Sequence, residues 1–204
     1  MEKTFVLKKN CEYPTCQIEV KKSRFIAEIF PIDNSSDVRQ ILKEQKQKYK
    51  DARHVVHAFI LSDVNVEGCS DDGEPSGTAG KPVLEVLKGS KIQNVLICVT
   101  RYFGGILLGT GGLVKAYSSA TKMLIEQLQL QNLIEEKIEM KDFEFSVLYE
   151  FYDQIKKIFA LYSVVVQNED FQTEIFIKAS APQKDYEKVF QEIKNATCGS
   201  VNFC

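Results

Sequence analysis

Residues 94–117 read NVLICVTRYFGGILLGTGGLVKAY, and the rest of the sequence can be arranged around this stretch. It begins with residues 95–99, VLICV, which are all apolar and include β-branched side chains. The run is too short for a free-standing helix and stops shortly before a glycine cluster, so it predicts a buried strand in the middle of a sheet. The stretch as a whole therefore predicts a strand, a glycine-rich loop and a helix.

The glycine loop comprises residues 101–112, RYFGGILLGTGG. Thr110 is predicted to cap a helix that runs to about Gln131. The buried face of this helix is predicted to carry Leu113, Tyr117, Ala120, Leu124 and Leu128. A helix start leaves N–H groups unpaired at the positive end of the helix dipole, and Arg101 and Lys115 are close in sequence, so an anion could bind there. The alternative is that the glycines only allow the helix to pack tightly against the sheet.

A second unusual stretch is GCSDDGEPSGTAGKP, residues 68–82. Ten of the eleven glycines lie between positions 68 and 112, which concentrates special backbone conformations in one region. Oxygen-bearing side chains cluster in the stretch: Ser70, Asp71, Asp72, Glu74, Ser76 and Thr78. Oxygen ligands suit Mg²⁺ or Ca²⁺, but the spacing does not match an EF-hand loop. The favoured interpretation is that these side chains accept hydrogen bonds from nearby backbone N–H groups and form turns.

The two stretches together carry a family resemblance. The sequence CSDDGEPSGTAGKP, followed about twenty residues later by RYFGGILLGTGGLVKAY, resembles the YigZ/IMPACT family over residues 23–128. The resemblance implies an N-terminal α/β domain like domain 2 of ribosomal protein S5. In bacterial members it also implies a ferredoxin-like C-terminal domain similar to late domains of elongation factor G. For function the resemblance implies less than for the fold: the eukaryotic branch of the family regulates translation by binding a scaffold protein.

Composition narrows the class of protein. The 204 residues are 44% hydrophobic, and no apolar run approaches the length of a membrane span. The N-terminus does not resemble a signal peptide, so we expect a cytoplasmic protein that does not enter a membrane. Its six cysteines show no zinc-finger spacing and are expected to be reduced thiols. Residues 1–137 carry 19 Lys and Arg against 17 Asp and Glu, and residues 138–204 carry 7 against 11, which does not indicate a general nucleic-acid binder.

Three further elements precede the acidic stretch. Residues 21–32 predict a strand, and Asp37 is predicted to cap a helix, with Gln40 completing a capping box. Residues 53–61, RHVVHAFIL, predict another strand, on which positions 54 and 57 point to opposite faces and so cannot share one metal ion. The family resemblance favours Arg53 and His57 as the functional residues of this strand. Cys69 or Ser70 with His57 as base would form a nucleophilic pair, but the sequence lacks the elbow motif of such enzymes.

The pattern restarts after a charged hinge predicted at residues 132–137. Strands are predicted at residues 141–149, 164–167, 173–179 and 200–203, and helices at residues 151–162 and from Pro182. This βαββαβ order is the ferredoxin-like arrangement. The predicted fold class is therefore α+β, with an S5 domain 2-like domain at residues 1–134 and a ferredoxin-like domain at residues 138–204.

Two functions are compared. The favoured one is a cytoplasmic binding and regulatory protein, linked to translation, that contacts RNA, the ribosome or a protein partner through the glycine loop. The alternative is a metal-assisted enzyme that acts on a phosphorylated or otherwise anionic small molecule. No complete catalytic signature is present, so a non-enzymatic role is favoured, and no cofactor or metal ligand is assigned. The predicted binding residues for an anion or partner are Arg53, His57, Asp71, Asp72, Glu74, Ser76, Arg101, Tyr102, Gly104, Gly105, Thr110, Gly111, Gly112 and Lys115.

Overall fold

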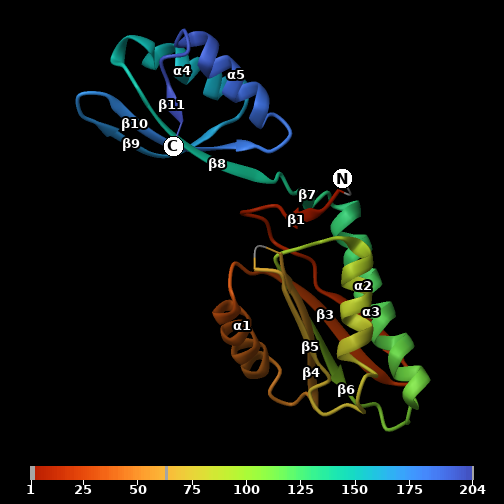
Figure 1. Cartoon of the computed structure of the whole chain (residues 1–204). Coiled ribbons are helices and arrows are strands. Elements are labelled where there is room, and N and C mark those ends of the chain that lie inside the picture. Colours follow the sequence, from red (N-terminus) through yellow and green to blue (C-terminus); the bar gives the residue numbers. More distant parts are fainter. Residues whose placement is uncertain (1–2, 63, 204) are drawn as a thin grey trace. The chain divides into compact units, whose positions relative to one another are not determined.

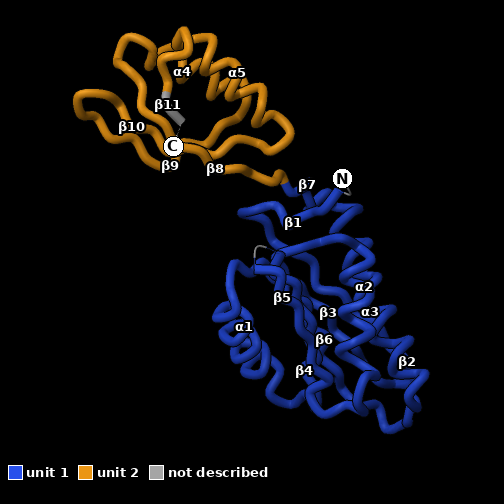
Figure 2. Tube along the Cα trace, in the orientation of Figure 1, with its two compact units in different colours: residues 1–137 blue, residues 138–204 orange. Residues whose placement is uncertain are grey.

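The computed structural model describes residues 3–62 and 64–203, and the chain divides into two compact units (Figure 2). Unit 1 contains residues 1–137 and unit 2 contains residues 138–204. Each unit mixes helices with strands and has its own hydrophobic core. The mixed α and β class predicted from the sequence is confirmed.

The centre of unit 1 is an antiparallel sheet of five strands (Figure 1). In spatial order they are β2 (Cys16–Val20), β3 (Ser23–Pro31), β6 (Val95–Tyr102), β4 (His54–Leu61) and β5 (Val66–Ser70). The apolar run at residues 95–99 lies in the middle strand, as predicted. β6 continues through Arg101 and Tyr102 because both residues still pair with a neighbouring strand, so they belong to the sheet rather than to a loop.

Helices cover both faces of this sheet (Figure 1). α1 (Ser35–Lys48) packs on one face through Val38, and α2 (Gly80–Ser90) and α3 (Thr110–Leu130) pack on the other. The predicted apolar stripe of α3 is buried, and the Tyr117 ring meets the Phe25 ring edge to face at 5.1 Å between centroids. These contacts fix the start of α3 beside the ends of β3 and β6.

The capping residue predicted for α1 was wrong by one turn. The helix begins at Ser35, and the Asn34 side chain accepts hydrogen bonds from the N–H groups of Ser36 and Asp37. Asp37 instead accepts from the Asn34 N–H at 3.0 Å, which completes a capping box from inside the helix. The acidic side chain of Asp37 also suits the positive end of the helix dipole. The sequence therefore indicated a capping box at the right place, but the capping residue is Asn34, three residues earlier.

The cap predicted for α3 was also wrong. Thr110 is the first helical residue, and the cap position is held by Gly109, which has a φ of 72° and no side chain to accept a hydrogen bond. Threonine adopts this left-handed region only with strain, whereas glycine enters it freely. α2 likewise begins after Ala79, and Pro82 lies in its first turn, where its missing N–H costs no helical hydrogen bond.

Two short strands join the ends of unit 1. β1 (Phe5–Leu7) pairs antiparallel with β7 (Ile134–Glu136), and Lys3 forms an exposed ion pair with Glu136 at 2.7 Å. The hinge predicted at residues 132–137 therefore contains a strand, because a partner strand from the N-terminus supplies the hydrogen bonds that a charged segment lacks by itself.

Unit 2 has the predicted βαββαβ order. Its elements are β8 (Met140–Val147), α4 (Tyr149–Leu161), β9 (Val165–Phe171), β10 (Ile175–Pro182), α5 (Tyr186–Ala196) and β11 (Asn202–Phe203). The antiparallel sheet has the spatial order β11-β8-β10-β9, and a cluster of aromatic and aliphatic side chains joins it to the two helices. Pro182 ends β10 rather than opening α5, which begins four residues later.

The cysteines of the described chain are unpaired. Cys11, Cys16, Cys69, Cys98 and Cys198 are free, and Cys204 lies outside the described residues. Cys98 is fully buried in β6, and burial raises the pKa of its thiol far above the ordinary value. It packs as a small apolar side chain.

Candidate functional site

A buried ion pair joins the acidic stretch to the central strand. Arg101 Nη1 donates to Glu74 Oε1 at 2.7 Å, and the Tyr117 hydroxyl donates to the same oxygen at 2.8 Å. Glu74 is 9% exposed, Arg101 5% and Tyr117 0%. Burial, together with the negative charge of Glu74, raises the pKa of Tyr117 well above its usual range, so the hydroxyl remains a donor. These three buried side chains have lost their contact with water, and the hydrogen bonds and the ion pair between them replace it.

Arg101 is held on several sides. Its guanidinium lies 5.5 Å from the Phe25 ring centroid and 5.6 Å from that of Phe103, and Nη2 donates to Ser23 Oγ at 3.3 Å. Most of its charge is therefore used inside unit 1 rather than offered to a ligand. Its Nε is the exception, because this buried donor has no acceptor among the described residues.

The structure separates the two histidines and reverses their expected roles. His54 Nδ1 lies 2.8 Å from the carbonyl oxygen of Asp72, which requires the proton on Nδ1, and Nε2 lies 4.0 Å from Glu74 Oε1. His57 lies on the opposite face of β4, on the side of α1 and near Lys46. Burial lowers the pKa of His57, although the charge of Asp72 acts against this, so His57 is neutral at pH 7. The histidine beside the ion pair is thus His54.

The aspartates of the acidic stretch shape the chain. Asp71 accepts hydrogen bonds from the N–H groups of Gly77, Ala79 and Gly80, the last two at the start of α2. Partial burial alone would raise the pKa of Asp71, but the three donated bonds lower it below its usual value. Asp72 accepts from the Val55 N–H at 2.7 Å and pairs with a lysine of α1. These contacts match the predicted turn-forming role.

Replacing Asp71 with alanine should therefore destabilise unit 1. The three backbone donors would lose their charged acceptor, so we expect a loss of about 2–4 kcal/mol in the free energy of unfolding. Asp71→Asn keeps one acceptor oxygen and should lose about half as much. Urea unfolding, followed by the amide NMR signals of unit 1, measures both values. Equal stability of Asp71→Ala and the natural chain would show that the N–H groups find other acceptors.

A cavity of about 420 Å³ opens beside the ion pair. It is lined by Arg53, His54, Glu74, Pro75, Arg101, Phe103, Leu107, Leu108, Gly109, Thr110 and Leu113. The acidic stretch and the glycine loop thus face the same cavity. One wall belongs to the glycine loop, whose residues 103–109 connect β6 to α3 and expose large apolar side chains. Leu107 is 82% exposed, and Phe103 and Ile106 are both 43% exposed.

Comparison with known proteins identifies the family. Residues 21–125 match the model of the Impact N-terminal domain, which is about half of the chain. An IMPACT family member of Haemophilus influenzae is 34% identical over 184 residues, covering 89% of this chain and 87% of the relative. The chain belongs to the IMPACT family. IMPACT family member YigZ of Escherichia coli is 32% identical over 186 residues, covering 90% of this chain and 89% of YigZ.

A solved structure agrees with this membership of the IMPACT family. The crystal structure of a hypothetical protein is 30% identical to the chain, with a TM-score of 0.71. The likeness covers 100% of this chain and 97% of the other. The fold is therefore similar over the whole length of this chain.

Only some of the predicted binding residues meet at the cavity of this IMPACT-family chain. Those that line it are Arg53, Glu74, Arg101 and Thr110. Those that do not are His57, Asp71, Asp72, Ser76, Tyr102, Gly104, Gly105, Gly111, Gly112 and Lys115. Tyr102 contacts Arg24 at 4.5 Å from its ring centroid instead. Lys115 follows Thr110 by five residues and so points about 140° away around the helix.

Several residues of the cavity were missed by sequence reasoning. They are His54, Pro75, Phe103, Leu107, Leu108, Gly109 and Leu113. The available signal was the apolar quartet of Phe103, Ile106, Leu107 and Leu108 inside a glycine-rich loop. Large apolar side chains in a loop are not placed in the core by the periodicity of a helix or strand. When several of them are exposed together, they indicate a surface that binds a partner.

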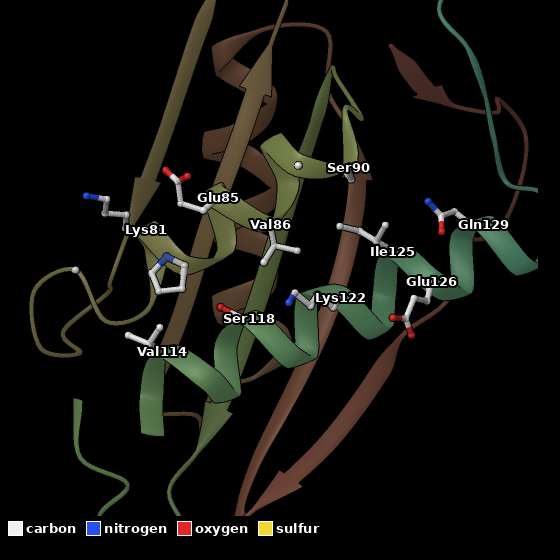
Figure 3. Close-up of a pocket in the computed structure, with 13 residues that line it drawn as sticks. Lys81, Glu85, Val86, Ser90, Val114, Ser118, Lys122, Ile125, Glu126 and Gln129 are labelled. Carbon is white, nitrogen blue, oxygen red and sulfur yellow. The ribbon is translucent and has the colours of Figure 1, made fainter. Parts of the chain in front are cut away.

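A larger cavity lies between α2 and α3 (Figure 3), and neither Glu74 nor Arg101 lines it. Its volume is about 670 Å³, and charged residues of both helices, including Lys81, Glu85, Lys122 and Glu126, alternate along it (Figure 3). None of the predicted binding residues lines this groove. Size alone does not assign it a ligand, because its charges are mixed and its lining contains no buried polar cluster.

Two further findings concern the described part of the chain. Within residues 3–62 and 64–203, no three His, Cys, Asp or Glu side chains converge in a way that would hold a metal ion. Over the same residues, no helix has both the length and the apolar content that crossing a membrane requires.

Proposed function

We propose that this IMPACT-family chain is a cytoplasmic, non-enzymatic regulatory protein linked to translation, which binds a protein component of the translation machinery through the glycine loop. The observation that carries the proposal is the exposure of Phe103, Ile106 and Leu107 beside a cavity. Aromatic and aliphatic side chains that surround a pocket are typical of protein interfaces. Translation enters through the resemblance of the sequence to a family whose eukaryotic branch regulates it.

Electrostatics favours a protein over RNA. Binding to RNA depends on Lys and Arg that neutralise phosphates, but Arg101 is already paired with Glu74. Lys115 does not line the cavity, and residues 138–204 carry an excess of Asp and Glu. Apolar contacts, with Arg53 at the rim, remain as the main source of affinity.

The geometry gives the metal-assisted enzyme no comparable support. Asp71 binds three backbone N–H groups, Asp72 binds another and a lysine, and Glu74 binds Arg101 and Tyr117. A metal ion would have to displace these partners. The carboxylates of the acidic stretch therefore serve the fold and the shape of the cavity.

Co-sedimentation with purified ribosomes tests the proposal. Leu107→Asn removes exposed apolar surface without adding charge. We therefore expect the affinity for ribosomes, calculated from the fraction of protein that sediments with them, to fall at least about tenfold. Leu130→Asn is the matched control, because Leu130 is 78% exposed at the end of α3, away from the cavity. It should bind like the natural chain.

The same experiment across a salt series separates protein from RNA as the partner. Apolar binding should change little with salt, whereas phosphate contacts weaken steeply. Steep salt dependence with no effect of Leu107→Asn would contradict the proposal in favour of RNA. Failure of the natural chain to bind ribosomes at any salt concentration would contradict its link to the ribosome.

A further inference from the structure

The sheet of unit 2 ends in a strand whose outer side is open. Among the described residues β9 pairs with β10 alone, so the N–H and C=O groups of alternate residues point away from the sheet (Figure 1). The register shifts between Asn168 and Val166, and residues 168–171 form the regular part of this edge. These four residues, called the β9 edge below, can accept a further strand from another chain.

Exposed aromatic rings lie beside the β9 edge. Phe171 contacts Tyr149 and Tyr152 of α4, with ring centroids 6.4 and 5.7 Å apart. The Tyr149 hydroxyl donates to the Gln172 carbonyl oxygen at 2.9 Å, which holds its ring against the end of β9. Phe171 and Tyr149 are each 53% exposed, and neither belongs to the core cluster of unit 2. Adjoining rings that the core does not use indicate a contact with another molecule.

Carboxylates outnumber lysines in the segments that carry these rings. Between Tyr149 and Lys157 of α4, and between Glu169 and Glu174 around the end of β9, the chain has five carboxylates and two lysines. They are Glu150, Asp153, Glu169, Asp170 and Glu174, with Lys156 and Lys157. Within the described residues only Glu169 of these five forms an ion pair, with Lys156 at 3.3 Å. Five negative and two positive charges leave a net charge of −3.

This combination of rings and negative charge selects a basic partner. Lys156 uses the same chemistry within the chain, because its Nζ pairs with Glu169 and lies 5.5 Å from the centroid of the Tyr152 ring. Arginine suits such a surface better, since its flat guanidinium stacks on a ring and can bind a carboxylate at the same time. RNA, or β9 of a second copy with its own Glu169 and Asp170, would bring further negative charge and is disfavoured.

We infer that the β9 edge binds an extended, arginine-bearing segment of a partner protein. The backbone of the segment pairs with residues 168–171 as a fifth strand of the sheet. Its side chains alternate between the two faces of the sheet. An arginine on the α4 side stacks on Phe171 and Tyr149 and pairs with Asp153, which lies one helical turn after Tyr149. The surface belongs to unit 2 and goes beyond the proposed function, which concerns unit 1.

Peptides test the inference on the full chain labelled with ¹⁵N. The parent peptide is acetyl-Arg-Val-Arg-Val-Arg-amide, which places all its arginines on one face when it is extended. Titration followed by NMR should show millimolar or tighter binding, with the largest shifts at the amides of residues 149–153 and 168–171. An analogue with citrulline in place of arginine keeps the shape without the charge. It should bind at least about fivefold more weakly, because charge-assisted hydrogen bonds are the stronger kind.

Two methylated analogues test the strand pairing. One is N-methylated at the valines and the other at the two arginines that follow them, so both keep the full charge. In an extended chain only alternate residues point their N–H groups at the neighbouring strand. One analogue should therefore bind at least about fivefold more weakly than the parent peptide, because it loses its backbone hydrogen bonds, and the other should bind like the parent.

Two pairs of variants locate the surface. Phe171→Leu keeps an apolar side chain but removes the ring, and it should weaken binding of the parent peptide about twofold to fivefold. Leu161→Ala is its control, because Leu161 is 74% exposed at the end of α4 and should leave binding unchanged. Asp153→Asn should weaken binding by a similar factor, about twofold to fivefold. Glu192→Gln removes the same charge from an exposed position of α5 and should have no effect.

Several outcomes would overturn the inference. Failure of the parent peptide to bind would do so, as would equal affinity for the citrulline analogue. If both methylated analogues bind like the parent peptide, no strand pairing takes place. Equal losses in Asp153→Asn and Glu192→Gln would indicate only general attraction between opposite charges. The ribosome experiment with Leu107→Asn concerns unit 1, so its failure would leave the β9 edge unaffected.

Discussion

Replacing Glu74 with alanine should cost unit 1 about 3–5 kcal/mol in the free energy of unfolding, because the buried guanidinium of Arg101 would lose its counter-charge. The Tyr117 hydroxyl would lose its acceptor in the same step, since both donate to Glu74 Oε1. Neither group can turn to water, because both are almost completely buried. This is the largest effect that we expect from a single side chain in the protein.

The exposed ion pair of Lys3 and Glu136 is the matched control. Its N to O distance is 2.7 Å, the same as that of Arg101 and Glu74, but both side chains are at least half exposed. Glu136→Ala should therefore lose no more than about 1 kcal/mol. Urea unfolding followed by the amide NMR signals of unit 1 compares the two variants without a contribution from unit 2. Similar losses in both would show that burial does not decide the strength of the Glu74 pair.

Gly104→Ala should also destabilise unit 1 severely, by about 3 kcal/mol or more. A Cβ at this position would lie 2.0 Å from the carbonyl carbon and oxygen of Lys22 and 2.4 Å from the Ser23 nitrogen. These are backbone atoms, which cannot rotate away as a side chain could. The shift would also disturb Ser23 Oγ, which accepts hydrogen bonds from the Gly104 N–H and from Arg101.

Gly111→Ala is the control from the same glycine loop. Gly111 lies in the first turn of α3 without a positive φ, and an added Cβ would meet no heavy atom within 4 Å. Alanine should be neutral or should stabilise the chain by about 0.4–1 kcal/mol, because it restricts the unfolded state. The same NMR-monitored urea unfolding measures both variants. A Gly104→Ala chain as stable as Gly111→Ala would refute the close backbone approach.

Periodicity predicted the central strand, the long helix and the order of unit 2, but it did not predict β2 or β5 of the central sheet. The continuous apolar run at residues 95–99 placed β6 in the middle of the sheet, and the stripe from Leu113 to Leu128 placed α3 on it. In unit 2 the alternation of apolar residues gave the βαββαβ order. These signals are strong because the burial of each element follows from residues that are near one another in sequence.

The details of the cavity depend on contacts that sequence periodicity does not contain. Tyr117 and Glu74 are 43 residues apart, so the local pattern could predict that Tyr117 is buried but not which oxygen accepts from its hydroxyl. Both faces of β4 are apolar, with Val56 on one and Val55 on the other, so alternation separated the histidines without showing which one reaches the cavity. Arg101 was expected to offer its charge to a ligand. Its partner, Glu74, lies in another segment of the chain, so local periodicity does not reveal the ion pair.

Site-specific photo-crosslinking at position 107 in cells tests the central claim most directly. A photoreactive residue in place of Leu107 should crosslink to a protein of the translation machinery, and the crosslink should weaken in an Arg53→Gln background. The same residue at position 130, which is equally exposed at the end of α3, should not give that product. Crosslinking of position 107 to RNA, or identical products from both positions, would contradict the assignment of the glycine loop as a protein-binding surface.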